Sequence, residues 1–147
     1  MSSRQVDISK KDIVYREATA TGRIRLSRAT LYLVRNNELE KGDPLSIAET
    51  MAIVGAKLTP TIVALCHQLN LEKVEPKVSL GPDCIDVTVT VCATGKTGVE
   101  MEALTAVSTA LLNVWDVVKA HEKDQDGQYP ATRIESVRVV RKVKRKS

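Results

Sequence analysis

Residues 73–91 read KVEPKVSLGPDCIDVTVTV and predict a β-hairpin around which the rest of the fold must be built. Apolar and polar residues alternate on both sides of Gly81-Pro82-Asp83, with the period of two that places alternate side chains on one face of a strand. The three residues between the two runs are typical of a turn. Because proline cannot donate a hydrogen bond to a neighbouring strand, Pro76 indicates that the first strand lies at the edge of a sheet.

A long amphipathic helix follows this hairpin. After a turn at 95–98, apolar residues recur through the segment 99–122 at the spacing of one helix face. They are Leu104, Val107, Leu111, Val114, Trp115 and Val118. The segment is long enough for about six turns, which would make it the longest element of the chain.

The flanking segments complete an α+β pattern. Alternation from Ile13 to Leu26 predicts one long strand or two short ones interrupted at Thr21-Gly22, and residues 133–143 predict a last strand. Helix starts between the first strand and the hairpin are marked by Ser27, Asp43-Pro44 and Thr59-Pro60, the second helix running to about Lys57. The order includes β-α-β-β-α-β, so we expect a ferredoxin-like α+β fold with an antiparallel sheet, helices on one face and an additional N-terminal helix.

Length and composition indicate one ordinary domain. The chain has 147 residues, 43% of them hydrophobic, and we expect a single domain over 1–147 with a flexible N-terminus and a basic C-terminal tail from about 138 to 147. No apolar run approaches the roughly 18 residues of a membrane span, and the opening MSSRQVDISKKD does not resemble a signal peptide. We therefore expect a cytoplasmic protein that does not bind a membrane.

The three cysteines, Cys66, Cys84 and Cys92, show no C-x-x-C spacing. An odd number without that spacing argues against a disulfide framework, a zinc ribbon and an iron–sulfur cluster. We expect reduced thiols and no resident metal or cofactor.

The charge is concentrated at the C-terminus. The net charge is +4, and the last ten residues include Arg138, Arg141, Lys142, Lys144, Arg145 and Lys146. Such a cluster attracts phosphates, either of a nucleic acid or of a small anionic ligand. The chain has no phenylalanine, one tryptophan and three tyrosines, so few aromatic rings are available to stack on single-stranded nucleic acid. This favours the small ligand, and a small basic RNA-binding α+β protein remains the alternative.

Gly95-Lys96-Thr97 stands between a strand and a helix, where phosphate-binding loops occur. A P-loop needs a glycine five residues earlier, and Thr90 stands there, so nucleotide hydrolysis of that type is not indicated. Free backbone N–H groups and the helix dipole still favour an anion at this position. A plain tight turn explains the same residues equally well.

One stripe of the long helix is polar. It contains Glu102, Thr105, Thr109, Asn113 and Asp116, and Lys119 borders it one turn after Asp116. A solvated face with an ion pair explains this stripe, and so does an acid/base pair, provided that burial brings both pKa values toward neutrality. Glu102 and Asp116 are about 21 Å apart along the axis, so they cannot touch one reacting atom within one chain. Either the ligand is long or the helix contributes to two sites, each completed by a neighbouring subunit.

Three further side chains have alternative interpretations. Cys66-His67 lies between apolar residues, and such a pair is more often structural than catalytic. Glu100 points toward the apolar side of the first helical turn, where its carboxylate needs either a frayed helix end that admits water or a partner, and we expect a partner.

Several motifs together resemble one family. These are Val6-Asp7-Ile8-Ser9 with Arg16, Lys57-Leu58-Thr59-Pro60, residues 65–69 (LCHQL), residues 95–106 (GKTGVEMEALTA) and residues 115–120 (WDVVKA). They are similar to the cyclic pyranopterin monophosphate synthases, the MoaC proteins of molybdenum cofactor biosynthesis, over nearly the whole chain. The family's Gly-Gly-Lys-Ser tail is Lys144-Arg145-Lys146-Ser147 here.

The resemblance implies a lyase. Its substrate would be a purine-derived triphosphate, the cyclised dihydro-GTP made by a radical GTP cyclase, and its products cyclic pyranopterin monophosphate and diphosphate. It implies no cofactor except Mg²⁺ with the triphosphate, and a hexamer built as a trimer of dimers with active sites at the dimer interface.

The resemblance also implies roles for particular residues. Asp116 and Lys119 would be the acid/base pair, with Lys57 close to them. The phosphates would meet Arg16 and Lys142. The pterin-forming part of the substrate would be bound by Leu65, Cys66, His67, Glu100, Met101 and Glu102.

Overall fold

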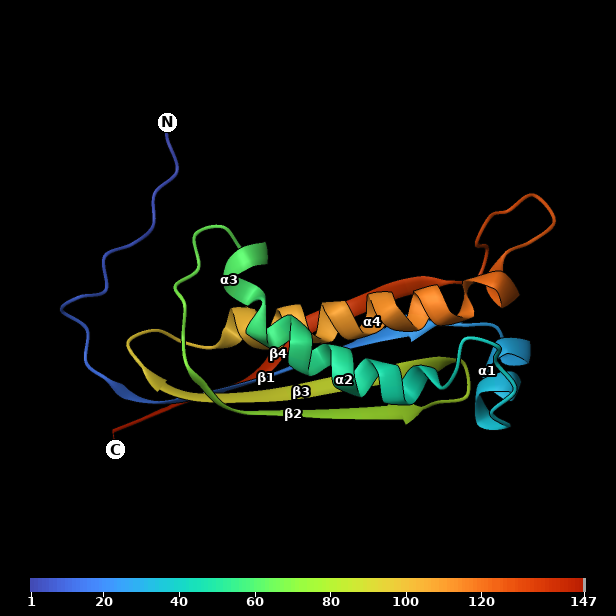
Figure 1. Ribbon diagram of the computed structural model, residues 1–147, viewed down its shortest axis with the longest axis horizontal. Coiled ribbons are helices and arrows are strands. Elements are labelled where there is room, and N and C mark those ends of the chain that lie inside the picture. Colours follow the sequence, from blue (N-terminus) through green and yellow to red (C-terminus); the bar gives the residue numbers. More distant parts are fainter. Residues whose placement is uncertain (147) are drawn as a thin grey trace.

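The computed structural model describes residues 1–146 as a four-stranded sheet with helices along one face (Figure 1). In chain order the elements are β1 (Val14–Arg25), α1 (Arg28–Arg35), α2 (Pro44–Lys57), α3 (Thr59–Ile62), β2 (Leu71–Leu80), β3 (Cys84–Gly95), α4 (Glu100–Glu122) and β4 (Arg133–Arg145). The strand order is β2-β3-β1-β4, and all neighbours are antiparallel. The expected ferredoxin-like α+β fold is confirmed.

The structure refines three details of the sequence prediction. An additional N-terminal helix is not found, since residues 1–13 contain no helix, and α1 is the helix expected after Ser27. Of the two alternatives for residues 13–26, one long strand is confirmed, because β1 is continuous through Thr21-Gly22. The last strand, expected over 133–143, extends as β4 to Arg145 and pairs with β1 that far, so most of the basic C-terminal segment is part of the sheet.

Close contacts at two glycines show how closely α4 packs against both β1 and α2. A Cβ atom at Gly22 of β1 would lie 2.8 Å from Val107 Cγ1, and one at Gly55 of α2 would lie 2.6 Å from Thr109 Oγ1. Only a residue without a side chain permits such a close approach. The core therefore forms where α4 meets β1, β3 and α2, with Leu111, Val114 and their neighbours fully buried.

The C-terminal end of α4 is fixed by its last residue, Glu122, which is buried. Its carboxylate accepts hydrogen bonds from the Ser27 hydroxyl (2.7 Å), the Thr132 hydroxyl (2.8 Å) and the Thr30 hydroxyl. Ser27 caps α1 and Thr132 precedes β4. This one carboxylate thus connects three segments and sets the direction of α4.

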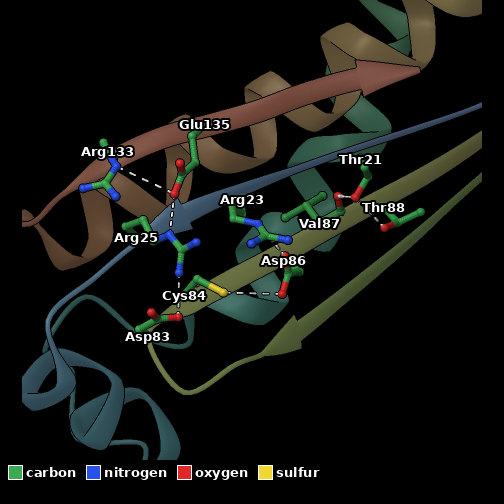
Figure 2. Close-up of polar contacts among 10 residues, drawn as sticks. All are labelled: Thr21, Arg23, Arg25, Asp83, Cys84, Asp86, Val87, Thr88, Arg133 and Glu135. Carbon is green, nitrogen blue, oxygen red and sulfur yellow. Dashed lines mark hydrogen bonds and ion pairs between the residues drawn. The ribbon is translucent and has the colours of Figure 1, made fainter. Parts of the chain in front are cut away.

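The sheet face opposite the helices is polar (Figure 2). Thr21 and Thr88 lie side by side with hydroxyl oxygens 3.0 Å apart, and Arg23 pairs with Asp86 at 3.3 Å. Arg25, near the end of β1, pairs with Asp83 of the hairpin turn and with Glu135 of β4 (Figure 2). These pairs connect the strands across this face.

By length and composition alone, α4 would also qualify as a membrane-spanning helix. About half of that stretch is buried inside the protein, against the sheet and α2. The core helix of a globular domain meets the same criterion, so the criterion does not indicate a membrane span here.

Candidate functional site

The candidate residues lie toward the two ends of α4, which spans Glu100–Glu122. At the C-terminal end, Asp116 lies between two lysines. Its Oδ1 is 3.0 Å from Lys119 Nζ, one turn further along the same helix. Its Oδ2 is 3.4 Å from Lys41 Nζ, which also donates a hydrogen bond to the Asp116 backbone oxygen at 3.1 Å. We call these three residues the Asp116 cluster.

Within one chain, Asp116 and Lys41 are exposed and Lys119 is partly exposed. The hydrogen bond from Lys119, followed by that from Lys41, lowers the pKa of Asp116, and the hydrogen bond to Asp116 raises the pKa of Lys119. Both shifts lead away from neutrality. The condition for proton transfer, burial that brings the two pKa values together, is therefore not met by one chain alone.

An apolar groove of about 430 Å³ adjoins the Asp116 cluster. Leu112, Trp115 and Ile134 line it together with Asp116 and Lys119. The Trp115 ring is supported by Tyr129, whose ring centroid lies 5.2 Å away in an edge-on arrangement. A flat ligand in this groove would have an apolar wall on one side and the ion pair on the other.

At the N-terminal end of α4, Glu102 is buried with 1% of its surface exposed. Cys66 Sγ donates to its Oε2 at 3.8 Å, and its Oε1 has no hydrogen-bond partner among residues 1–146. Burial raises the pKa of Glu102, and burial followed by the charge of Glu102 raises the pKa of the Cys66 thiol. A buried carboxyl with a free oxygen can accept a hydrogen bond from a ligand.

Four more predicted residues are at the same end. Leu65 and Met101 are exposed, and His67 is partly exposed next to Cys66. Glu100 has the partner that the sequence required, since Lys142 Nζ lies 3.2 Å from its Oε1. The distance makes this contact an ion pair, but the orientation of the two groups is not that of a hydrogen bond.

Arg16, in β1, lies close to the end of β3 that precedes α4. It is 5% exposed, and its Nε donates to the backbone oxygen of Gly95 at 3.1 Å. It contributes to a cavity of about 470 Å³, lined by Lys10, Lys11, Asp12, Val14, Arg16, Lys144 and Lys146. The basic side chains that line this cavity could bind phosphate groups.

Lys57 is the last residue of α2 and is exposed. α2 and α4 run antiparallel, because Lys41, just before α2, reaches Asp116, while Gly55 packs against Thr109 and Thr105. Lys57 therefore belongs to the Glu102 end of α4, and the expected closeness to Asp116 and Lys119 does not occur within one chain.

Sequence reasoning missed Lys41. It lies in the loop before α2, 75 residues from Asp116. Gly42-Asp43-Pro44 marks the start of a helix and so places Lys41 in the loop before it. The sequence does not show which residues Lys41 contacts. Within residues 1–146, no group of three or more His, Cys, Asp or Glu side chains is arranged to hold a metal ion.

Comparison with known proteins gives a consistent result. A model of the MoaC family matches residues 5–144. A relative in Sulfurisphaera tokodaii, named a probable cyclic pyranopterin monophosphate synthase, is 50% identical over 139 residues, 95% of this chain and 92% of the relative. One of the same name in Pyrococcus abyssi is 51% identical over 141 residues, 96% of this chain and 89% of the relative. One in Methanothermobacter thermautotrophicus, named a probable accessory protein of that synthase, is 50% identical over 141 residues, 96% of this chain and 89% of the relative.

Proposed function

Because the chain belongs to the MoaC family, we propose that it is a cyclic pyranopterin monophosphate synthase, a lyase of molybdenum cofactor biosynthesis. It would convert the cyclised dihydro-GTP to cyclic pyranopterin monophosphate and diphosphate. A radical GTP cyclase would supply the substrate, and any Mg²⁺ would arrive with the triphosphate. In this proposal the reaction takes place in the cytoplasm.

The Asp116 cluster beside the apolar groove is the observation that carries this proposal. The reaction opens a five-membered ring and closes a pyrazine ring, so protons must be removed and delivered. Asp116 and Lys119 offer a carboxylate and an ammonium 3.0 Å apart, and Lys41 adds a second ammonium. The wall formed by Trp115 and Leu112 would hold a flat bicyclic ring system next to them.

The Glu102 end would bind the substrate. In this proposal Leu65, Cys66, His67, Glu100, Met101 and Glu102 contact the pterin-forming part, while Arg16 and Lys142 meet the phosphates. Glu102 suits this role because it is buried and one carboxyl oxygen lacks a partner in the described chain. Lys57 would join Asp116 and Lys119 in the reaction.

Two copies are needed to bring these parts together. The Asp116 cluster and Glu102 are about 21 Å apart along one helix. A second copy related by a two-fold axis near the midpoint, Thr109, would place its Glu102 and Lys57 against the first copy's Asp116. It would also cover apolar side chains that are exposed along this surface, including Ile62, Met101 and Leu112.

The composite site would also change the electrostatics of the cluster. Burial under a second copy disfavours the charged form of each group, which opposes the shifts produced by the ion pairs. This would move the pKa values of Asp116 and Lys119 back toward neutrality. The full assembly in this proposal is a hexamer, a trimer of such dimers.

The RNA-binding alternative has less support. Part of the basic segment is engaged within the fold, since Arg141 pairs with Glu17 and Lys142 with Glu100. The family membership favours the lyase as well.

Incubation with the cyclised dihydro-GTP tests the proposal. The wild-type protein should form one pterin product, detected by fluorescence after oxidation, for each diphosphate released. Asp116→Asn and Lys119→Ala should each lower turnover by about two to four orders of magnitude while the fold and oligomer persist. Asp126→Asn, in the loop before β4, is the matched control and should react normally. Absence of diphosphate release by the wild type, or normal turnover of Asp116→Asn, would overturn the proposal.

A further inference from the structure

The loop 123–132 connects two walls of the apolar groove. It leaves the C-terminal end of α4, projects beyond the helix (Figure 1) and returns as β4. The helix α4 carries Trp115 and the strand β4 carries Ile134, and both side chains line the groove. The shape of the groove therefore depends on how this loop is held.

The tip of the loop is closed by its own hydrogen bonds. Asp124 Oδ1 accepts hydrogen bonds from the backbone N–H groups of Asp126 and Gln128, each at 2.9 Å. The Asp124 backbone N–H donates to the backbone oxygen of Gln128 at 2.9 Å, and Gly127 has a φ of +75°, which glycine adopts without strain. These contacts give the tip one defined shape.

The base of the loop is anchored in the protein interior. The Thr132 hydroxyl donates to the Glu122 carboxylate at 2.8 Å, and both side chains are buried. Tyr129 lies between this base and the closed tip and is itself partly buried. Its place relative to α4 is thus set from both sides.

Tyr129 contacts Trp115 edge-on, with ring centroids 5.2 Å apart and an angle of 63° between the ring planes. This arrangement is favourable because the positive edge of one ring meets the negative face of the other. Trp115 is only partly buried, and an indole at a helix surface has several staggered rotamers available. The contact with Tyr129 favours the rotamer in which the indole forms a wall of the groove.

Tyr129 is not among the residues that line the groove. Its effect on a ligand would therefore pass through Trp115. If the Tyr129 ring were removed, the indole could turn away and the groove would lose its flat side. The ion pair of Asp116 with Lys119 would persist, because it is made within α4.

We infer that Tyr129 is a positioning residue of the proposed reaction, which fixes the Trp115 ring as the wall against which a flat bicyclic ligand lies beside Asp116 and Lys119. The identity of the ligand rests on the proposed function. The loop 123–132 is then the part of the chain that sets how tightly such a ring system is bound.

Trp115 is the only tryptophan of the chain, so its fluorescence reports its surroundings directly. In Tyr129→Ala the emission should shift to longer wavelength and its anisotropy should decay faster, because the indole is more exposed and more mobile. Tyr129→Phe keeps the ring and should resemble the wild type. The control Tyr32→Ala removes an exposed tyrosine on α1 and should leave the emission unchanged. Unchanged emission and anisotropy in Tyr129→Ala would overturn the inference.

Ligand binding separates a positioning role from a merely structural one. Calorimetric titration with GTP, which contains a flat bicyclic purine, should give about fivefold weaker binding for Tyr129→Ala and wild-type binding for Tyr129→Phe and Tyr32→Ala. In pterin formation, the KM of Tyr129→Ala should rise by a similar factor, while kcat changes by less than about twofold because the ion pair is retained. Equal GTP affinity in all four proteins, or an unchanged KM, would contradict the inference.

Asp124→Ala tests the same role from the loop. It opens the closed tip and leaves the Tyr129 ring in place, so it should shift the Trp115 emission in the same direction and weaken GTP binding less than Tyr129→Ala does. Urea unfolding checks that each variant is folded. An Asp124→Ala protein identical to the wild type in emission and GTP affinity would remove the loop from the account. If emission and GTP binding change as described but the wild type forms no pterin, the proposed function fails and Tyr129 still positions Trp115.

Discussion

Asp116 is held between a lysine of its own helix and one from a distant loop. The pair Asp116–Lys119 is one turn apart, so helical geometry alone could predict it. Lys41 could not be predicted, because its contact with Asp116 depends on how α2 packs against α4 and not on any local pattern. For the same reason the sequence could not show that Lys57 and Asp116 lie toward opposite ends of α4 within one chain.

We predict that Lys41→Ala lowers kcat by about two orders of magnitude or more with a smaller effect on KM, because one of the two ammonium groups on Asp116 is lost. Lys41→Arg keeps the charge and should retain part of the activity. Steady-state pterin formation measures both, with Lys77→Ala as the control. If the kcat of Lys41→Ala equals that of the wild type, Lys41 has no role in the reaction.

The burial of Glu102 leads to a prediction about how the stability of the fold depends on pH. Burial raises its pKa above the ordinary value of 4.5, so the folded protein favours the protonated form. As pH rises, the Glu102 carboxyl loses its proton in the unfolded chain before it does so in the folded protein. The free energy of unfolding of the wild type therefore falls from about pH 4.5 up to the pKa of Glu102 in the folded state. Glu102→Gln keeps the size and removes the ionisation. It should be more stable than the wild type at neutral pH and equal to it in acid.

Urea unfolding at acid and neutral pH measures this difference. Glu72→Gln, an exposed carboxylate on β2, should show no such pH dependence. Lower stability of Glu102→Gln than of the wild type at neutral pH would show that the charged carboxylate is favoured in the fold.

At the scale of elements, the spacing of apolar residues predicted the hairpin and the long helix α4, and Pro76 predicted that β2 is an edge strand; the structure confirms all three. The helix could be predicted because its buried side repeats with the helical period. The choice between one strand and two for β1 could not be made, since Thr21-Gly22 is typical of a break, whereas Gly22 is in close contact with α4. β4 was expected over 133–143 and extends to Arg145, because its pairing with β1 continues that far.

The contact of α2 with α4 leads to a prediction for Gly55. Alanine at this position would place a Cβ atom 2.6 Å from Thr109 Oγ1 and 3.1 Å from the Thr105 backbone oxygen. The helices must then move apart, at a cost of about 1 to 3 kcal/mol that outweighs the better helix propensity of alanine, about 1 kcal/mol. Urea unfolding should show the loss, whereas Ser46→Ala, exposed on the same helix, should not. A Gly55→Ala protein as stable as the wild type would mean that the two helices are not in close contact.

At the scale of the whole molecule, one chain presents two half-sites. Asp116, Lys119 and Lys41 are at one end of α4, and Glu102, Cys66 and Lys57 are at the other. The sequence could indicate this separation because helical rise fixes the distance between Glu102 and Asp116. It could not indicate which surface a second copy covers, since that depends on exposed apolar side chains from both α3 and α4, such as Ile62 and Leu112.

Complementation between two inactive variants tests the shared site most directly. Lys57→Ala and Asp116→Asn alter opposite half-sites, so a mixed dimer contains one site with both changes and one with neither. The two variants, carrying different tags, are produced together, and the mixed assembly is isolated and assayed for pterin formation. If the two variants form dimers at random, half of the dimers are mixed, and each mixed dimer has one intact site of two. The assemblies should therefore show about a quarter of wild-type activity. Mixed assemblies as inactive as either variant alone would show that each site is built from a single chain.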